Sequence, residues 1–558
     1  MPAFVVLNAE RAISPSSVFE IFSCIVASSF WFRQTNAGAY VNIIWTYLVI
    51  FVLLCAGFAL YSFFRLSAAE GKKDFNLYEL VPPSASAVFV TDDILEFVAE
   101  VDDLACSKNQ QYLHVSKLFS YLKQYLYTLQ EEAPHGLSRQ MNQMLISFHE
   151  PDNIHNQVLY CRLGEGDRQL IDRFVQKYVS SLYPPKTFKY KGEDITIYPM
   201  ADGDFLACYL TSDFMALSYQ KKLIETVIDA HKTGKSLADD PTFAEAATPK
   251  KSPAVATVYA HLEGMMGWTE FDMKLRDDFI YFTGVCHETD TCFTFMNVLR
   301  QQESVEGFPG EALPSTAFCF TKQGVTDWAS LLSYGDMQET GVRTSDVRNR
   351  NRELSHYLME NAGQELVACL FQREDTLQEA AAVLSLSVSD VTEAERMLRS
   401  LINTVSAEER GKAPLITFCY TANKAYPVYR LPQTTLFTQL TGFAEPTSHT
   451  YATFYEGRLL LAPDENSLSR YIRQLDKGEV LNGAIAYRTG MDNLSDSYHF
   501  MLMADFDHLF HQAAKQIHFV PDFFLRNSEF FRNFILFAQF TCADGVIYPN
   551  IVLRYKSE

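Results

Sequence analysis

The 558-residue sequence lacks the short motifs that most directly reveal a function. It contains no CxxC pair, so neither a thioredoxin-type redox site nor a zinc ribbon is indicated. It also contains no GxSxG nucleophile elbow, no Walker loop, no GxGxxG turn and no HExxH helix. These absences argue against the enzyme and nucleotide-binding classes that those motifs define, and the sequence indicates no cofactor and no metal.

Basic side chains are also scarce, with 47 Lys and Arg against 67 Asp and Glu and a net charge of −20. No positive field attracts nucleic acid, which is therefore not an expected partner. Hydrophobic residues make up 48% and charged residues 20% of the chain, which excludes a disordered protein. An aromatic content of 14% favours β-rich structure, and the length predicts more than one domain.

A long apolar run lies near the N-terminus. No charged residue occurs between Gln34 and Phe64, and Ile43 to Phe64 is almost wholly apolar. A helix of this length crosses a hydrocarbon core of roughly 30 Å at 1.5 Å per residue. The sequence therefore predicts an uncleaved transmembrane helix over residues 42–64, with the lipid bilayer as a partner.

The segment before this run, residues 1–41, has no clear status. Its apolar stretch Ile21–Phe32 is too short to span a bilayer, so it is either an interfacial segment or the result of a start-site error. The charges that flank the predicted helix leave its orientation open.

After a short polar stalk at residues 65–81, alternating strand and helix patterns predict an α+β body. The polar stretch Gln301–Gly310 is the best boundary within it. The predicted parts are residues 82–300, a linker at residues 301–311, and residues 312–558. The expected fold is a transmembrane helix followed by two related halves, each with its own antiparallel sheet and packed helices.

The relation between the halves rests on an internal match. Tyr209–Leu237 aligns without a gap on Thr453–Leu481 at an offset of 244 residues. Each copy reads as a β-hairpin, an amphipathic helix and a Gly suited to a left-handed cap. The half starts, Ser86–Thr91 and Thr316–Thr321, also look alike. A diverged duplication explains this better than chance similarity of two hairpin–helix units.

Three stretches carry a resemblance to a known family: Asn76–Val90, Gly457–Ala462 and Ala543–Tyr555. Together they resemble an uncharacterised family of single-pass envelope proteins of Bacteroidetes-type bacteria, described as a domain of unknown function, over roughly residues 40–558. The resemblance implies an inner-membrane anchor with the bulk of the chain outside the cytoplasm. It implies no activity, ligand or catalytic residue.

Cys286 and Cys292 are one candidate site. They flank residues 287–291 between two alternating runs, Phe279–His287 and Cys292–Asn297, which are both predicted strands. A hairpin would place the two Cys residues opposite one another, so a cross-strand disulfide and two free thiols both remain open.

A second candidate is a group of four Arg side chains within ten residues: Arg343, Arg348, Arg350 and Arg352. They indicate either a solvated loop or a docking loop for an anionic partner, because guanidinium groups pair well with carboxylate and phosphate.

A predicted helix over Asp505–Phe519 places His508, His511 and His518 on one face. Lys515 lies among them and repels a cation, so a polar outer face is preferred to a metal site.

Two function classes follow. The first is a non-catalytic binding or scaffold module of the bacterial inner membrane, whose partner is another envelope protein, a peptide or a glycan. The alternative is an envelope hydrolase with a site assembled from scattered Asp, Glu and His residues. A cleft with closely spaced acids or His residues and shifted pKa values favours the hydrolase, and a flat, aromatic-lined groove between the halves favours binding.

Overall fold

The structure is a computed structural model, and Phe75–Glu558 form one unit within it. It describes residues 75–109, 139–150, 153–164, 167–174, 184–200, 203–248, 254–261, 267–286, 293–338, 344–372, 380–403, 415–422, 424–431, 433–442, 449–512 and 522–556, with single positions 118, 123, 126, 128 and 131.

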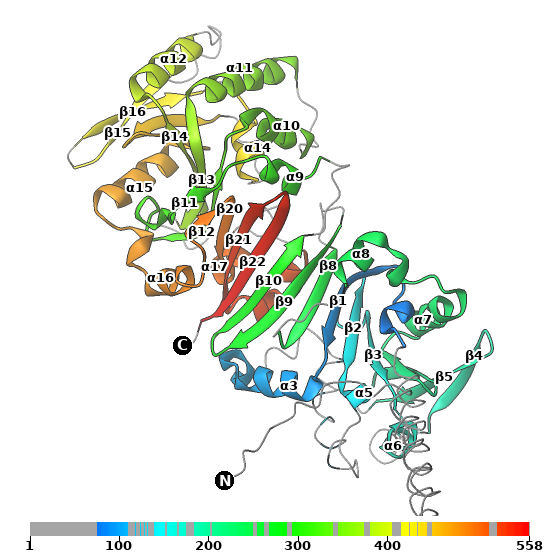
Figure 1. The fold of residues 1–558 in the computed structure, drawn as a ribbon. Helices are drawn as coiled ribbons and strands as arrows, with labels where there is room; N and C mark the ends of the chain where they lie inside the picture. The colour runs from blue at the N-terminus through cyan, green and yellow to red at the C-terminus, as the bar shows by residue number, and fades with distance from the viewer. Residues whose placement is uncertain are drawn as a thin grey trace, which may run out of the picture. The chain divides into compact units, whose positions relative to one another are not determined.

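Within these described residues, twenty strands form one continuous antiparallel sheet (Figure 1). The first half contributes β1 (Ala85–Thr91), β2 (Met144–His149), β3 (Gln157–Arg162), β4 (Lys186–Tyr190), β5 (Glu193–Pro199), β6 (Phe205–Leu210), β7 (Phe214–Ser218), β8 (Ala256–His261), β9 (Trp268–Arg276) and β10 (Phe279–Cys286). The second half contributes β12 (Ala317–Gly324), β13 (Ala362–Gln372), β14 (Ala380–Val388), β15 (Ile416–Tyr420), β16 (Ala425–Arg430), β17 (Tyr451–Tyr455), β18 (Arg458–Ala462), β20 (Phe500–Asp505), β21 (Phe534–Ala543) and β22 (Val546–Tyr555). A separate small sheet pairs β11 (Val305–Glu306) with β19 (Ser497–Tyr498).

The two sets of ten strands follow the same order. The first runs β4-β5-β6-β7-β3-β2-β1-β8-β9-β10. The second runs β15-β16-β17-β18-β14-β13-β12-β20-β21-β22. The registers agree as well, as two equivalent pairs show: Leu159 opposite Leu217 in the first half, and Leu384 opposite Leu461 in the second.

The two sets join where β10 pairs with β22, and Thr283 lies directly opposite Asn550 there. Matching the β9–β10 register to the β21–β22 register makes Asn550 the counterpart of Thr283, at an offset of 550 − 283 = 267. A pseudo-twofold axis therefore passes through this residue pair, and each half ends at the axis with its tenth strand.

Helices cover both faces of the sheet in each half. One face carries α7 (Lys221–Thr233), α8 (Pro241–Ala246), α15 (Glu465–Asp476) and α16 (Ile485–Met491), with the 3-10 turns η1 (Leu77–Leu80), η5 (Leu237–Asp239), η6 (Pro309–Glu311) and η7 (Leu481–Gly483). The other face carries α3 (Ile94–Asp103), α5 (Arg139–Asn142), α6 (Asp167–Phe174), α9 (Phe295–Arg300), α10 (Trp328–Gln338), α11 (Ser345–Asn361), α12 (Val391–Asn403), α14 (Leu436–Thr441), α17 (Phe506–Gln512), α18 (Asp522–Arg526), α19 (Ser528–Phe531) and η2 (Ala105–Asn109). Neither element type can bury its apolar side alone, so helices must pack on the sheet.

The hairpin–helix unit shows why the sequence folds this way. In the second half, the Asp464 side chain accepts a hydrogen bond from the Ser467 amide and caps the N-terminus of α15. Leu468 and Ile472 are buried one turn apart against the strands, and Gly478 at φ +72° supplies the left-handed residue after the helix. The 244-residue offset continues beyond this unit, through α8 and α16 to β8 and β20.

The predicted fold class needs correction. Two separate sheets were expected, whereas the β10–β22 pairing makes one sheet of both halves. The predicted helix at residues 137–148 is instead α5 followed by strand β2, and the predicted strand Cys292–Asn297 gives way to helix α9 from Phe295. The half starts also align differently: matching β-bulges at Ala85/Ala87 and Ala317/Cys319 give an offset of 232, not 230.

The membrane assignment is also corrected. Among the residues that the structure describes, no helix combines the length and the apolar character needed to cross a bilayer, which stands against a single-pass inner-membrane localisation with an extracytoplasmic bulk. The predicted helix itself, residues 42–64, lies outside the described residues, as do residues 1–41.

Because both halves share one sheet, we expect them to unfold together. Leu553 lies on β22 opposite Ile280 of β10 and is buried. Replacing it with Ala should cost about 3 kcal/mol, because a cavity opens at the junction of the two halves. Hydrogen exchange in denaturant should show equal loss of protection in β3 and β14, whereas Ile485→Ala on an exposed side chain should change neither. Loss confined to the second half would contradict a single cooperative sheet.

Candidate functional site

The strongest candidate for a functional surface lies at the pseudo-twofold axis. Residues directly opposite one another on neighbouring strands point to the same face of a sheet. This rule places side chains of four adjacent strands on one face, which also carries the buried Gln539 and Val552. We call its seven other polar and aromatic residues the junction face: Asp272, Lys274, Tyr281, Thr283, Thr541, Tyr548 and Asn550. Figure 1 shows the four strands, β9, β10, β22 and β21, side by side.

The junction face is open to solvent at its centre. Lys274 and Thr283 are exposed, and 41% of Tyr548 is accessible, although all three lie on strands in the middle of a twenty-stranded sheet. Tyr281 and Tyr548 are counterparts under the 267-residue offset and flank the axis. A polar and aromatic composition at mid-sheet indicates a surface selected for contact rather than for burial.

Tyr281 is held in place by the second half. Its hydroxyl donates to Oδ1 of Asn493 at 3.0 Å, and the Asn493 side-chain amide donates to the Thr489 carbonyl at 2.8 Å. Burial raises the pKa of Tyr281 above its ordinary value, so the phenol stays neutral at physiological pH. The ring is therefore a fixed element of the junction face, while Tyr548 is the more accessible of the pair.

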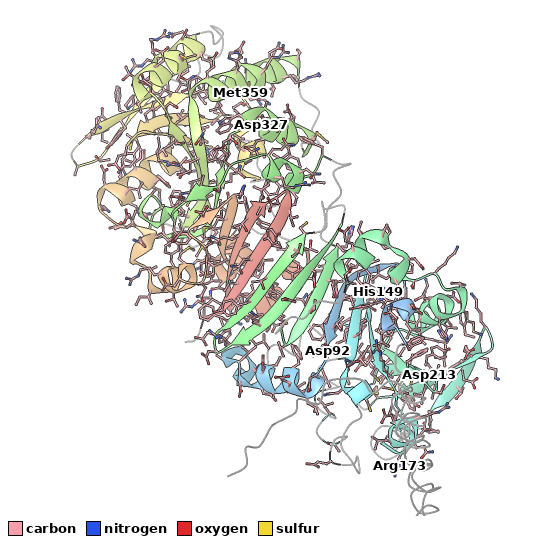
Figure 2. All side chains as sticks on the ribbon, viewed as in Figure 1. Asp92, His149, Arg173, Asp213, Asp327 and Met359 are labelled. Atoms are coloured by element: carbon pink, nitrogen blue, oxygen red, sulfur yellow. The ribbon has the colours of Figure 1, made fainter. Side chains whose placement is uncertain are left out.

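A Ser–His pair lies on strand β2 of the first half, where Figure 2 labels His149. The Ser147 hydroxyl is 2.8 Å from Nε2 of His149, and the Ser84 hydroxyl is 3.3 Å from Nδ1. A hydrolase nucleophile and its base need this spacing. However, Ser147 is 0% and His149 2% exposed, so no substrate reaches them. Burial lowers the pKa of His149 to about 4, which keeps the imidazole neutral as a structural hydrogen-bonding group.

A charged network with a buried Lys residue joins β12, β13 and β18 of the second half, and its other two members, Glu365 and Arg458, are partly buried. Lys322, 4% exposed, contacts the Glu365 carboxylate at 2.9 Å, and Arg458 contacts the other carboxylate oxygen at 2.7 Å. Lys322 also donates to the carbonyls of Glu306 and Gly307. Burial would raise the pKa of Glu365, but the hydrogen bond from Lys322 and the charge of Arg458 outweigh it and keep that pKa below its usual value. Since every charge is paired, this network is structural.

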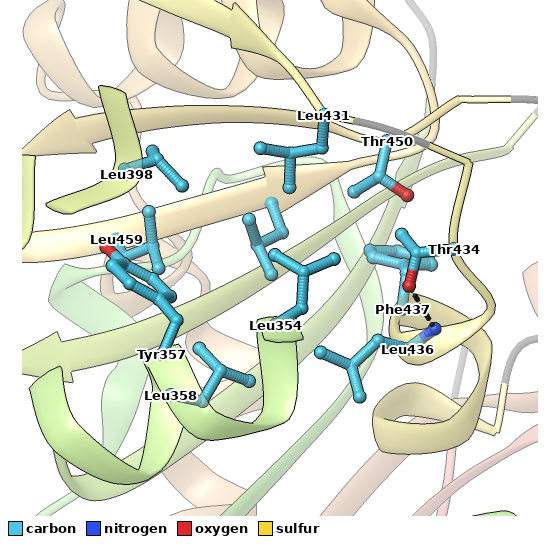
Figure 3. A pocket seen from close by; sticks show the side chains of 11 residues that line it. Leu354, Tyr357, Leu358, Leu398, Leu431, Thr434, Leu436, Phe437, Thr450 and Leu459 are labelled. Atoms are coloured by element: carbon cyan, nitrogen blue, oxygen red, sulfur yellow. Dashed lines mark hydrogen bonds between the residues drawn. The ribbon is translucent and has the colours of Figure 1, made fainter. Parts of the chain in front are cut away.

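A small pocket lies between α11, α12, α14 and β18 (Figure 3). Its volume of about 10 Å³ holds at most about one water molecule. Its walls are almost entirely Leu, Tyr and Phe, with two Thr residues. The Leu436 amide donates to the Thr434 hydroxyl at 3.1 Å, whereas the buried Thr450 hydroxyl has no hydrogen-bond partner within the described part of the chain. The pocket is too small for a substrate.

The candidate residues from the sequence do not come together at one site. Cys286 ends β10, is buried, and lies opposite Thr269 and Ile547, so the hairpin on which the disulfide prediction rested is not formed. Cys292 lies outside the described residues, and the disulfide stays a prediction. Arg343 also lies outside them.

The other three Arg residues, Arg348, Arg350 and Arg352, lie on α11 rather than on the predicted loop. Arg352 donates to the Asn349 side chain at 3.4 Å and is exposed, as is Arg348. Their role as a docking segment stays a prediction.

The described residues contain no group of three or more His, Cys, Asp or Glu side chains placed to hold a metal. His508 instead contacts Asp505 at 3.3 Å, and His511 contacts Asp507 at 3.4 Å. His518 and Lys515 lie outside the described residues.

The sequence analysis expected a binding feature between the halves but identified none of the residues of the junction face, because they come from segments related by an offset of 267 residues. The alternation in Tyr281–Thr283 and Tyr548–Asn550 was visible as strand pattern. A partial signal for this face was that polar residues recur at every second position in strands that are otherwise rich in apolar residues.

The buried His149 predicts acid sensitivity. Its pKa is about 4 in the folded chain and about 6.5 when unfolded, so the unfolded state binds more protons between these values and stability falls as pH falls. Between pH 7 and pH 5 the wild type should lose about 2 kcal/mol more unfolding free energy than His149→Gln. Urea unfolding of both proteins at both pH values measures this difference, and parallel losses would contradict it.

The charged network predicts a large mutational effect. Glu365→Ala should lower the unfolding free energy by about 3 kcal/mol, because it leaves Lys322 buried without its carboxylate. Glu393→Ala, which removes an exposed partner of Arg396, should leave the urea midpoint unchanged. Equal shifts for the two variants would show that the buried network is no more important than a surface pair.

Comparison with known families gives one match. Residues 148–275 are similar to a family described as "Protein of unknown function (DUF3352)". The matched segment runs from the end of β2 to β9, and the repeat-equivalent strands from β13 to β21 lie outside it. The match supports the description as a domain of unknown function, but it supports neither a membrane anchor nor a Bacteroidetes origin. Curated proteins and solved structures give no match to the chain.

Proposed function

We propose that the chain is a non-catalytic binding or scaffold module that binds a protein partner on the junction face. The observation that carries the proposal is the solvent-open group of polar and aromatic side chains at the pseudo-twofold axis, where Tyr281 and Tyr548 flank the Thr283–Asn550 pair. Tyr side chains supply a large contact area at little entropic cost, and Thr and Asn add adaptable hydrogen bonds.

The shape of the surface favours a macromolecule over a small molecule. A small-molecule site usually encloses several hundred Å³, whereas the pocket described above has about 10 Å³ and lies in the second half. The junction face is built from neighbouring strands of one sheet, so a partner must present a complementary surface to it. A protein or peptide segment meets this requirement.

The charged residues of the junction face are distributed unequally across the pseudo-twofold axis. Asp272 and Lys274 lie on the first-half side, whereas their repeat counterparts, Gln539 and Thr541, are neutral. A protein partner therefore meets Asp272 and Lys274 on one side of the axis and neutral residues at the two equivalent positions on the other. Electrostatic complementarity of this kind selects orientation more than it adds affinity.

Site-specific photo-crosslinking tests the proposal. A photoreactive residue replaces Tyr548 in the full chain, and Met337, which is also exposed, receives the same residue as a control. We expect a protein adduct from position 548 and none from position 337.

Binding then has to be measured with purified components. The captured protein should bind the wild-type chain, and Thr283→Arg should weaken that binding by at least about 10-fold, since a bulky charge then blocks the centre of the face. Met337→Arg should bind like the wild type. Equal adducts at both positions, or full binding by Thr283→Arg, would reject the junction face as the binding surface.

A further inference from the structure

The two ends of the sheet differ in character. In the described part of the chain, β4 and β15 each pair with one neighbour, β5 and β16. On β15, three apolar side chains alternate along one face and are largely exposed: Ile416 at 42%, Phe418 at 52% and Tyr420 at 65%. An exposed apolar edge strand is a template for pairing with another strand.

The repeat shows that this edge is not a general property of the fold. The registers of the outer strands make Lys189 of β4 the counterpart of Phe418, at an offset of 229. β4 also carries Lys186, and Lys191 follows it in the turn. Lys on an edge strand prevents strand addition. β15 has no charged residue at all, although the chain carries a net charge of −20.

The sequence of β15 is self-complementary. If two copies pair antiparallel about Phe418, Ile416 of each copy lies opposite Tyr420 of the other, and Phe418 lies opposite Phe418. All three apolar residues then form one ladder on one face, which is the pairing that stabilises antiparallel sheets. The same chain already joins its two halves by antiparallel pairing of two strands about a residue pair on an axis, in β10 and β22.

We propose that β15 pairs with β15 of a second copy and forms a twofold symmetric dimer centred on Phe418. The dimer closes because the other free edge, β4, is protected by Lys side chains and does not extend the assembly. This inference is independent of the binding function proposed for the junction face, which lies on different strands.

The area involved indicates a weak dimer. A whole aromatic side chain has roughly 150–250 Å², so each copy exposes roughly 300 Å² on Ile416, Phe418 and Tyr420. Two copies then bury at most roughly 600 Å² of side chain, less than the 1,200 Å² or more typical of stable complexes. We therefore expect dissociation in the micromolar range.

Sedimentation velocity of the full chain over roughly 1 to 200 μM tests the dimer. The wild type should shift from monomer to dimer and no further. Phe418→Lys, which gives β15 the residue that β4 carries at this position, should raise the dimer dissociation constant at least about 10-fold. Lys189→Ser on β4 is the matched control and should not change it.

Cysteine cross-linking tests the register. Under diamide oxidation, Phe418→Cys should form a covalent dimer, because position 418 faces itself. Ile416→Cys should cross-link efficiently only when mixed with Tyr420→Cys, and the wild type shows the background of its own Cys residues.

A wild type that remains monomeric over this concentration range would overturn the proposal. So would a dimer that Phe418→Lys leaves intact, since another surface would then hold it together. Equal cross-linking at positions 416, 418 and 420 would exclude the antiparallel register.

Discussion

The antiparallel pairing of β10 with β22 is the interaction on which the rest of the structure depends. Each half ends in a strand that would otherwise be an open edge, and the pairing buries both edges at once. Because Thr283 faces its own counterpart, Asn550, the pairing repeats one set of contacts on either side of the axis. Ile280 with Leu553 and Cys286 with Ile547 are two versions of the same contact. The long sheet follows from this single junction between two ten-stranded units.

The repeat has kept its backbone while its side chains have diverged according to their surroundings. Val90 of β1 corresponds to Lys322 of β12, a partly buried hydrophobe in one half and a buried cation in the other. The cation is tolerated because Glu365 and two backbone carbonyls satisfy it. At the outer edges of the sheet the cation lies in the first half instead, where Lys189 is the counterpart of the apolar Phe418 in the second half. Strand order and register are therefore the same in both halves, whereas the positions of the polar side chains differ between them.

Much of this architecture was predictable from local patterns, and its assembly was not. The alternation in Phe214–Ser218 and Arg458–Leu461, followed by amphipathic helices and Gly234 or Gly478, predicted the hairpin–helix units that the structure contains. The helix predicted at residues 137–148 was wrong because its apolar run is that of a buried strand, which has no clear period of two. The joining of the halves depends on contacts between residues 261 to 275 positions apart, which no local pattern records. The same sequence separation hid the junction face. Ser147 and His149 are only two positions apart, but the sequence does not show that both are buried, and their burial makes the contact structural.

For the binding function proposed above, the pseudo-twofold axis also bears on the orientation in which a partner would bind. A surface with true twofold symmetry would accept a partner in two equivalent orientations. Here Gln539 is fixed by two hydrogen bonds with the Ser495 backbone, at 2.6 Å and 2.9 Å, and is almost fully buried. Its counterpart Asp272 is partly exposed and charged. Since Asp272 can form an ion pair with a bound protein and Gln539 cannot, the two orientations of such a protein would differ in free energy. Duplication thus placed Tyr281 and Tyr548 on either side of the axis, and divergence made the two sides chemically different.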